Sequence, residues 1–307
     1  MAQTEILLES GTNEIEIMQF TILGELYGIN VAKVREIMMS DRVKPMPHAH
    51  MAVEGIFKPR DIVLTVIDLP KYLTGQSEKG ERDLFIITNF NKMNIAFRVH
   101  SVLGISRISW EDIHKPDNTI SQGEDGVATG IAQCGDKLVT ILDFEKIVAD
   151  IAPQTSIQLS EIDAMGQRER NESCILLAED SLLLRKMIDT ALTKAGYVNI
   201  KNFNNGREAW NYLKTVRSDE DLDKKVNIII TDIEMPEMDG HRLTKLVKED
   251  SILKRIPLVI FSSLISPEMK IKGEELGADA QLSKPEIGRL VSVIDSLLQN
   301  NGGNENG

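Results

Sequence analysis

The spacing of hydrophobic and polar residues changes near the middle of the chain. Before about residue 150, short segments such as 83–90 (DLFIITNF) and 94–100 (NIAFRVH) carry β-forming residues and are separated by Gly, Asn and Asp. This pattern predicts paired β-strands. After about residue 172, apolar runs such as 174–180 (CILLAED) alternate with segments of helical period such as 181–196 (SLLLRKMIDTALTKAG). Five strands that alternate with five helices predict an α/β domain with a doubly wound parallel sheet.

The first half contains an internal repeat. Residues 55–73 (GIFKPRDIVLTVIDLPKYL) align without a gap with residues 130–148 (GIAQCGDKLVTILDFEKIV). The alignment pairs Asp68 with Asp143, and each of these acids stands between an apolar strand and a short amphipathic segment. We therefore predict that each aspartate caps a short helix. A repeat of this size predicts two similar small sheets in one all-β domain, a double small barrel.

The amino-acid composition argues against several classes of binding partner. The chain has 47 acidic and 35 basic residues among 307, for a formal net charge of −12, which argues against nucleic acid and against an anionic membrane surface. Its two cysteines predict neither a disulfide framework nor a zinc site, and they favour a reducing cytoplasm. The first residues lack a signal-peptide pattern, and no apolar run approaches the roughly 20 residues of a membrane span. We expect no direct membrane insertion.

The changes in pattern divide the chain into four predicted segments. Residues 13–152 form the all-β domain, and residues 153–171, which are polar and contain a proline, form a linker. Residues 172–299 form the α/β domain. The tail, residues 300–307 (NNGGNENG), is rich in Gly and Asn and is expected to be disordered.

The α/β half ends its predicted strands with polar residues. Glu179 and Asp180 follow the first strand, Asp232 the third, Ser262 ends the fourth and Lys284 follows the fifth. In the common strand order 2-1-3-4-5, these ends converge on one crevice. Three acids in one crevice repel one another unless a cation lies between them, and oxygen ligands favour Mg²⁺. A carboxylate beside Mg²⁺ can accept a phosphoryl group, so we predict that Asp232 is a phosphoacceptor.

These residues, with MPEMDG after Asp232, make residues 172–299 resemble the receiver domain of two-component response regulators. The resemblance implies that Asp232 is the phosphoacceptor. It also implies that Asp180, Asp232 and the backbone carbonyl of Glu234 hold Mg²⁺, with Glu179 in support. As a phosphoprotein of this kind, the chain would respond to a histidine kinase.

The resemblance implies that two further residues bind the phosphate, and the chain departs from the family pattern at one position. Ser262 and Lys284 would bind the phosphate oxygens after transfer. Gln281 stands where many receivers carry an aromatic switch residue, which puts the usual aromatic readout in doubt. A Mg²⁺-dependent phosphatase of the haloacid-dehalogenase type also uses an aspartyl nucleophile, but it needs an aspartate where this chain has Glu234.

Residues 1–151 contain no recognisable catalytic constellation, which favours a binding module. We interpret His48 and His50 as surface residues, because no carboxylate or cysteine near them in sequence completes a metal site. Residues 27–38, 45–69 and 127–148 resemble the corresponding stretches of the CheW-like coupling domain of bacterial chemotaxis.

The CheW-like resemblance spans residues 13–152. It implies that this domain binds the histidine kinase CheA and methyl-accepting chemoreceptors, and it makes Arg60 a candidate contact residue. The family usually has Arg-Gly at this position, whereas this chain has Arg60-Asp61.

A CheW-like domain followed by a receiver is the architecture of CheV-type chemotaxis coupling proteins, which the chain resembles as a whole. The resemblance implies an adaptor rather than an enzyme, located in the cytoplasm at receptor–kinase arrays and regulated by phosphorylation of Asp232. One alternative is a phosphate sink that drains CheA without changing coupling. A regulator that binds DNA is disfavoured, because the charge is acidic and no helix-turn-helix follows the receiver.

Overall fold

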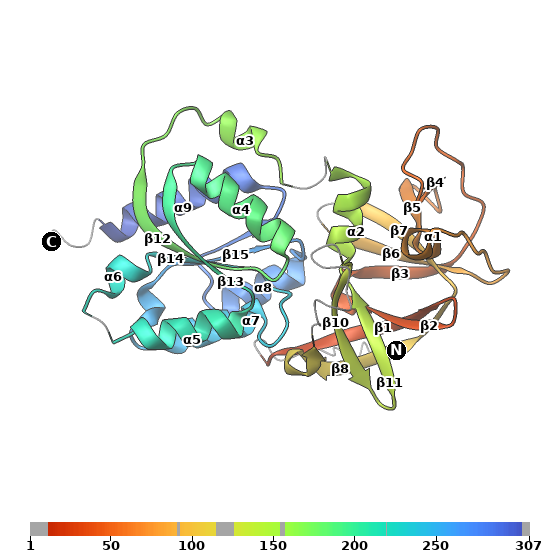
Figure 1. The fold of residues 1–307 in the computed structure, drawn as a ribbon, viewed down its shortest axis with the longest axis horizontal. Helices are drawn as coiled ribbons and strands as arrows, with labels where there is room; N and C mark the ends of the chain where they lie inside the picture. The colour runs from red at the N-terminus through yellow and green to blue at the C-terminus, as the bar shows by residue number, and fades with distance from the viewer. Residues whose placement is uncertain (1–11, 91–92, 115–125, 154–156, 219, 303–307) are drawn as a thin grey trace. The chain divides into compact units, whose positions relative to one another are not determined.

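The computed structural model describes residues 12–90, 93–114, 126–153, 157–218 and 220–302 (Figure 1). These residues form two compact units. The β unit contains residues 15–108 and 112–153, and the α/β unit contains residues 157–302 together with 12–14 and 109–111. Each unit has its own hydrophobic core.

The β unit contains two sheets within the described residues. One has the order β8 (Ser101–Ser109), β1 (Glu14–Ile22), β2 (Glu25–Asn30), β11 (Lys137–Leu142), β10 (Ala128–Cys134), β9 (Ile113–His114). The other has the order β3 (Val34–Met39), β6 (Leu84–Phe90), β7 (Met93–Val99), β5 (Leu64–Asp68), β4 (Val53–Phe57). Its helices are η1 (Val31–Lys33), α1 (Leu69–Thr74) and α2 (Phe144–Ile151), and η2 (Trp110–Asp112) lies where the two units divide.

The two sheets repeat one pattern of strands. In the first sheet, β2 of the antiparallel hairpin β1–β2 pairs in parallel with β11 of the antiparallel hairpin β10–β11. In the second sheet, β7 of the antiparallel hairpin β6–β7 pairs in parallel with β5 of the antiparallel hairpin β4–β5. The order β8-β1-β2-β11-β10 therefore matches β3-β6-β7-β5-β4. This confirms the prediction of two similar small sheets. The first hairpin of the β unit pairs with its last one, so the first sheet joins both ends of the domain, whereas the second is built from the consecutive strands β3 to β7.

The aspartates of the sequence repeat cap equivalent helices. Asp68 Oδ1 accepts a hydrogen bond from the Lys71 N–H at 2.9 Å at the start of α1. Asp143 Oδ1 accepts one from the Lys146 N–H at 3.0 Å at the start of α2. The predicted caps are confirmed. Each satisfies a backbone donor that the first helical turn leaves without a partner.

The glycines that open the two repeats share a physical cause. A Cβ on Gly55 would lie 2.1 Å from the Lys44 carbonyl oxygen, and one on Gly130 would lie 3.2 Å from the His114 carbonyl oxygen. At Gly55 the backbone of a flanking segment crosses directly over the glycine, so any side chain would displace that segment. At Gly130 the nearest atom is Ile113 Cγ2, 2.4 Å from the added Cβ, so a side chain there would first displace the Ile113 side chain.

Phe144 connects the cores of the two sheets. Its ring lies 4.7 Å from that of Phe97 on β7 and 6.3 Å from that of Phe20 on β1, both in edge-on geometry. All three rings are fully buried. Because Asp143 caps the helix that begins with Phe144, the repeat positions one aromatic side chain between the sheets.

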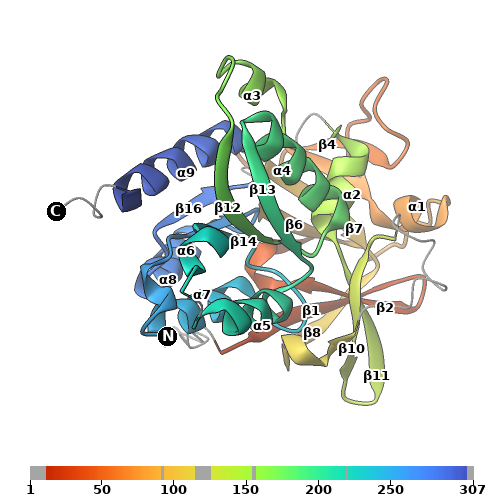
Figure 2. The ribbon, with the colours of Figure 1, turned by 60° about the vertical axis from the view of Figure 1, so that its left-hand side comes forward.

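The α/β unit is a parallel five-stranded sheet between two layers of helices (Figure 2). Its strands, in spatial order, are β13 (Tyr197–Phe203), β12 (Asn171–Ala178), β14 (Ile228–Thr231), β15 (Leu258–Ser262) and β16 (Ala280–Ser283). Its helices are α3 (Ser160–Asp163), α4 (Leu182–Lys194), α5 (Gly206–Val216), α6 (Leu222–Lys225), α7 (Gly240–Glu249), η5 (Leu253–Arg255), α8 (Pro267–Glu275) and α9 (Ile287–Gly302).

The strand order confirms the predicted doubly wound sheet of order 2-1-3-4-5. Side chains of α3, α4 and α9 pack on one face, and side chains of α5, α6 and α7 pack on the other. Every residue of β14 and β15 is buried. Strands covered on both faces have no polar face, which explains why they appear in the sequence as uninterrupted apolar runs.

Part of the segment predicted as a linker, residues 153–171, is packed into the α/β unit. It contains α3, and Ile157 and Ile162 are buried in the core that α4 and α9 share. At the other end, α9 continues to Gly302 and so includes the start of the predicted tail, 300–307. Residues 303–307 lie outside the described residues. Among the helices described, none is long and apolar enough to cross a membrane.

We expect the Asp143 cap to stabilise the β unit. Asp143→Ala should lower its free energy of unfolding by about 1 kcal/mol, because one backbone donor of α2 loses its partner, whereas Asp143→Asn should keep most of the stability. Urea denaturation followed by circular dichroism measures the difference. Asp136→Ala is the matched control, since Asp136 is exposed in the turn between β10 and β11. Equal stability of Asp143→Ala and the control would contradict this role.

Candidate functional site

The polar residues predicted to converge do stand at one edge of the parallel sheet. Glu179 and Asp180 directly follow β12, Asp232 follows β14, and Lys284 follows β16, while Ser262 is the last residue of β15. Hydrogen-bonded register pairs Ala178 with Thr231 and Ser262 with Ser283 at the ends of these strands. The carboxyl ends of adjacent parallel strands therefore bring the side chains together.

Three of these residues form an acidic cluster. Glu179, Asp180 and Asp232 each offer a carboxylate oxygen, and the three atoms lie within 4.8 Å of one another. Glu179 is 1% exposed and Asp232 3% exposed, whereas Asp180 is partly open to solvent. Oxygen donors at this spacing, with one open side, fit Mg²⁺, which keeps several of its waters when bound to protein. The donor set therefore matches the predicted ion.

Lys284 compensates the buried acids. Its Nζ lies 2.8 Å from Asp232 Oδ2 and 3.0 Å from Glu179 Oε2, and the residue is only 3% exposed. Counting the four charged side chains, three at −1 and one at +1 sum to −2, the charge that a divalent cation balances. Burying the two carboxylates without this partner would be strongly unfavourable.

The backbone around Asp232 fixes the direction of its side chain. The Ile233 N–H donates to Asp232 Oδ1 at 2.6 Å, and the Asp232 N–H donates to the Ala178 carbonyl at 3.0 Å. A Cβ on Gly240 would lie 1.8 Å from the Asp232 carbonyl oxygen, so only glycine lets α7 begin this close to the acid. This explains the glycine of the MPEMDG sequence.

Ser262 lies on the strand next to Asp232, where it was predicted, and is fully buried. Its hydroxyl accepts a hydrogen bond from the Leu264 N–H at 3.3 Å, and its carbonyl accepts one from the Lys284 N–H at 3.2 Å. Glu234 lies two residues after Asp232 and is half-buried. Metal binding through the Glu234 carbonyl remains a prediction.

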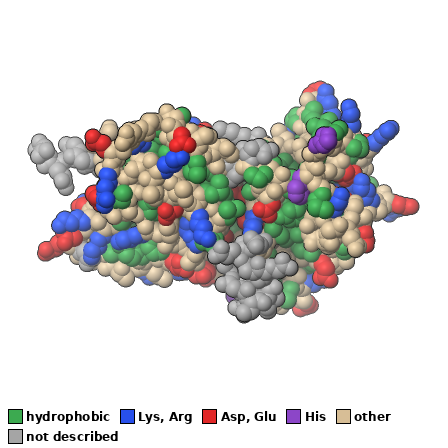
Figure 3. All heavy atoms as spheres, turned by 45° about the horizontal axis from the view of Figure 1, so that its top comes forward, with side chains coloured by type: hydrophobic (Ala, Val, Ile, Leu, Met, Phe, Trp, Pro, Cys, Tyr) green, Lys and Arg blue, Asp and Glu red, His purple; other side chains and the backbone are tan. Residues whose placement is uncertain are grey.

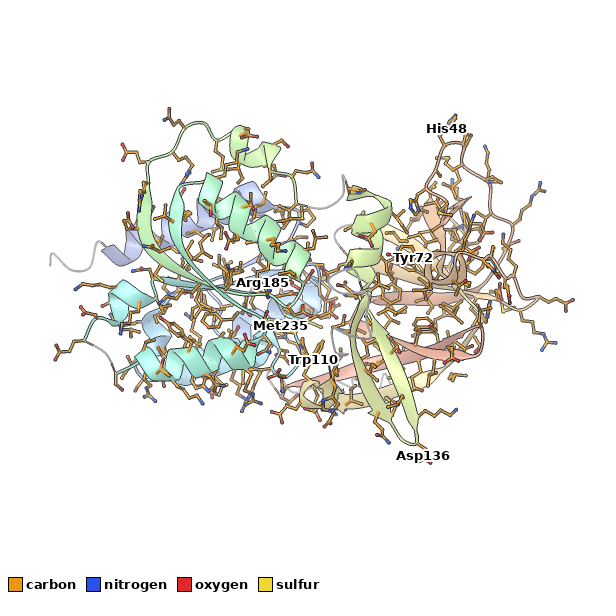
Figure 4. The ribbon with its side chains drawn as sticks, in the orientation of Figure 1. His48, Tyr72, Trp110, Asp136, Arg185 and Met235 are labelled. Carbon is orange, nitrogen blue, oxygen red and sulfur yellow. The ribbon has the colours of Figure 1, made fainter. Side chains whose placement is uncertain are left out.

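Arg185 supports the site and was missed by the sequence analysis. One guanidinium nitrogen, Nη1, donates to the Glu179 carbonyl at 2.8 Å and to Asn204 Oδ1 at 2.7 Å, joining the loops that follow β12 and β13. Figure 4 shows Arg185 and Met235 at the same end of this unit. A search of strand ends could not find Arg185, because it lies on α4 and acts through a backbone carbonyl.

The side chain of Gln281, at the position where many receivers have an aromatic residue, contacts α8. Its Nε2 donates to the Lys270 carbonyl at 2.7 Å. A Cβ on Gly273 would lie 2.3 Å from Gln281 Oε1, so the amide lies directly across this helix. Oε1 is buried and has no hydrogen-bond partner among the described residues. The position is thus joined to α8 by a polar contact.

Burial shifts two titrating groups at the start of α7. Asp239 caps the helix through the Arg242 N–H, 2.6 Å away, and burial raises its pKa to about 6. His241 is buried, and loss of solvation lowers its pKa to about 4. Its Nε2 has no hydrogen-bond partner among the described residues. The imidazole is therefore neutral at physiological pH.

The candidate residues of the β unit are on its surface. Arg60 is exposed in the connection between β4 and β5, and its contact with a partner remains a prediction. His48 is exposed in the connection between β3 and β4 (Figure 4). His50 Nδ1 accepts a hydrogen bond from the Ala52 N–H at 3.2 Å. Within the described parts of the chain, the acidic cluster is the one group of side chains with metal-ligand spacing.

Comparison with known families matches both halves of the chain. Residues 16–152 match the CheW-like domain, and residues 175–295 match the response regulator receiver domain. The two matches follow each other in the chain and lie on the β-rich and α/β parts respectively.

Two relatives match nearly the whole chain. Chemotaxis protein CheV3 of Helicobacter pylori is 32% identical over 310 residues, which cover 94% of this chain and 96% of that protein. Chemotaxis protein CheV1 of the same organism is 27% identical, covering 94% of each. Among solved structures, the scaffolding protein TtCheW of Thermoanaerobacter tengcongensis has a TM-score of 0.40 and 22% identity, covering 47% of this chain and 91% of that one.

We expect Asp180 to contribute directly to Mg²⁺ affinity. Asp180→Asn should raise the Kd for Mg²⁺ by roughly tenfold or more, because one negative donor leaves the cluster. Isothermal titration measures the change, and circular dichroism confirms that the fold is kept, as expected for a partly exposed side chain. The control is Asp189→Asn, an acidic position on α4 outside the cluster. Unchanged affinity in Asp180→Asn would contradict the assignment.

The buried His241 predicts a pH-dependent loss of stability. Its pKa is lowered to about 4 in the folded chain from 6.5, so the unfolded chain binds the proton first as the pH falls. The contribution of the buried, neutral imidazole to the free energy of unfolding is fully present above pH 6.5 and is lost as the pH falls toward 4. From about pH 7 to about pH 4.5, urea denaturation should show wild type losing about 2 kcal/mol more than His241→Leu. Equal losses would show that the imidazole is not buried in its neutral form.

Proposed function

The chain belongs to the CheV family of chemotaxis proteins, and from this membership we propose that it is an adaptor whose coupling activity is controlled by phosphorylation of Asp232. The β unit would link chemoreceptors to the histidine kinase CheA, and the α/β unit would receive the phosphoryl group. One observation carries the proposal. A buried aspartate that is paired with Lys284 and surrounded by Mg²⁺-type donors stands in the same chain as a CheW-like domain.

The residues of the cluster would have different roles in phosphoryl transfer. Glu179, Asp180 and Asp232 would hold Mg²⁺, with Glu234 contributing its carbonyl. When bound, the ion supplies positive charge that neutralises phosphate oxygens. An oxygen of Asp232 attacks phosphorus, the P–N bond to the kinase histidine breaks, and the leaving imidazole nitrogen takes up a proton.

Lys284 and Ser262 respond to the new group. Lys284 Nζ, which is 2.8 Å from Asp232 Oδ2 before transfer, pairs with a phosphate oxygen afterwards. The Ser262 hydroxyl leaves the Leu264 N–H and binds another phosphate oxygen. Because β15 and β16 are neighbours, both responses occur on adjacent strands. The added negative charge thereby favours a second conformation of the unit.

The adaptor role rests on the β unit. Its exposed Arg60 is our candidate contact with the kinase or the receptors. On the face drawn in Figure 3, acidic and basic side chains are interspersed. We place the chain in the cytoplasm at receptor–kinase arrays. Phosphorylation of Asp232 modifies the chain itself, so we class the protein as an adaptor and not as an enzyme.

The proposal predicts that a phosphoryl mimic changes coupling only through Asp232. Purified chain is mixed with receptor membranes and CheA, with Mg²⁺ and with or without beryllofluoride, and kinase activity is read in the sedimented complexes. We expect the mimic to change kinase activity by roughly fivefold or more with wild type and to have no effect with Asp232→Asn. Asp136→Asn, which alters an exposed acid of the β unit, should behave as wild type.

Other outcomes have distinct meanings. Co-sedimentation that the mimic leaves unchanged would replace the switch by a scaffold with an attached phosphate sink. Failure of the chain to sediment with receptors and kinase would remove the adaptor role.

A further inference from the structure

The segment between the two units is partly fixed to the α/β unit. We define residues 157–168 as the strap. Ile157 is 4% exposed and Ile162 2% exposed, and both lie in the core formed with side chains of α4 and α9. Leu159 and Met165 pack against the same core. The strap is therefore held by apolar contacts along its length, although half of its twelve residues are polar.

The strap makes a direct hydrogen bond to the first turn of α9. Glu161 Oε2 accepts from the Gly288 N–H at 2.9 Å. A Cβ on Gly288 would lie 3.1 Å from this oxygen and 3.3 Å from Glu161 Cβ, which shows how closely the strap follows the helix. A carboxylate is favourable at a helix N-terminus, where backbone N–H groups lack partners within the helix.

The far end of the strap has a stronger anchor. Arg168 Nη2 lies 2.6 and 2.7 Å from the two oxygens of Asp295, and its Nε donates to the Ala195 carbonyl at 2.8 Å. The Tyr197 hydroxyl donates to the same carboxylate at 2.5 Å. This anchor lies two turns along α9 from Gly288 and is shared with β13. The Glu161 contact, which is a single exposed hydrogen bond, is the weaker of the two.

A short path joins the weak contact to the acidic cluster. Lys284, whose Nζ pairs with Asp232 and Glu179, is followed by a tight turn in which the Glu286 N–H donates to the Ser283 carbonyl at 2.8 Å. Glu286 Oε2 in turn accepts from the Ser283 N–H at 3.2 Å. Four residues after Lys284 comes Gly288, which donates to Glu161. A movement of Lys284 therefore acts on the N-terminal turn of α9.

We propose that the strap is a latch controlled by phosphorylation: its contact with α9 through Glu161 forms while Asp232 is unmodified and opens when Asp232 is phosphorylated. The proposal rests on the phosphorylation proposed above. Transfer moves Lys284 from the two carboxylates to the phosphate and so displaces the first turn of α9. Opening breaks the Glu161–Gly288 hydrogen bond and loosens the packing of Ile157 and Ile162 against the core, while the Arg168 anchor stays closed. The connection between the coupling and receiving units then becomes longer and more flexible.

The first test is hydrogen exchange of the full chain with Mg²⁺, with and without beryllofluoride. We expect amide exchange in residues 157–163 to become at least several-fold faster with the mimic, with peptides around Arg168 and Asp295 unchanged. Asp232→Asn should show no response. Exchange in residues 157–163 that stays unchanged, while the mimic binds and changes kinase activity, would overturn the latch and leave the proposed function intact. No response to the mimic anywhere in the chain would overturn both.

The second test uses the reciprocity of coupling. If phosphorylation weakens the Glu161 contact, then removing this contact must favour the phosphorylated conformation by the same factor. Glu161→Ala should therefore bind the beryllofluoride–Mg²⁺ pair on the order of fivefold more tightly than wild type. Glu161→Gln, which keeps an acceptor oxygen, should stay near the wild-type affinity.

The matched control for the second test lies on the same short helix. Asp163 pairs with Lys194 on α4, away from Gly288, at 2.5 Å and with both side chains largely exposed. Asp163→Asn should leave the affinity for the mimic unchanged. Equal affinities in Glu161→Ala, Asp163→Asn and wild type would show that the strap is a fixed part of the fold and not a latch.

Discussion

The buried ion pairs of Lys284 with Asp232 and Glu179 are the constraint on which the site depends. A carboxylate this deeply buried is tolerated only where a cation compensates it, and the ammonium of Lys284, which follows the edge strand β16, does so here. The same arrangement leaves the cluster with a net charge of −2 once Asp180 is included, which suits a divalent ion. The ion pairs that stabilise the buried acids are therefore also the ones that leave the cluster with a charge suited to Mg²⁺.

The two units have different folds, and each fold supports a different part of the proposed function. In the α/β unit, parallel strands deliver functional side chains from distant parts of the sequence to one edge. Because α9 begins three residues after Lys284, a change of charge at this edge reaches the helix whose Gly288 N–H binds Glu161 of the strap. In the β unit, a duplicated hairpin and capped helix place Phe144 between two sheets, which gives the two sheets a common core.

Much of the fold and of the site could be predicted from the sequence, because the relevant signals are local. Asp68 and Asp143 could be identified as caps from their immediate neighbours, and Asp232 and Lys284 from their positions after apolar strands. The pairing of β1–β2 with β10–β11 could not, since it joins opposite ends of a domain. Nor could the burial of Ile162, because Leu159, Ile162 and Met165 form too short a stretch to establish a helical period within a polar segment.

The most direct test of the account is transfer of the phosphoryl group itself. CheA phosphorylated on its histidine would be mixed with the full chain in the presence of Mg²⁺ or of a chelator, and the mass of the chain followed over time with the modified residue located by peptide mapping. The account predicts a Mg²⁺-dependent gain of one phosphoryl group on Asp232, absent from Asp232→Asn, with loss of the group from the kinase. Transfer that persists in Asp232→Asn, or a wild-type chain that takes up no phosphoryl group, would contradict it.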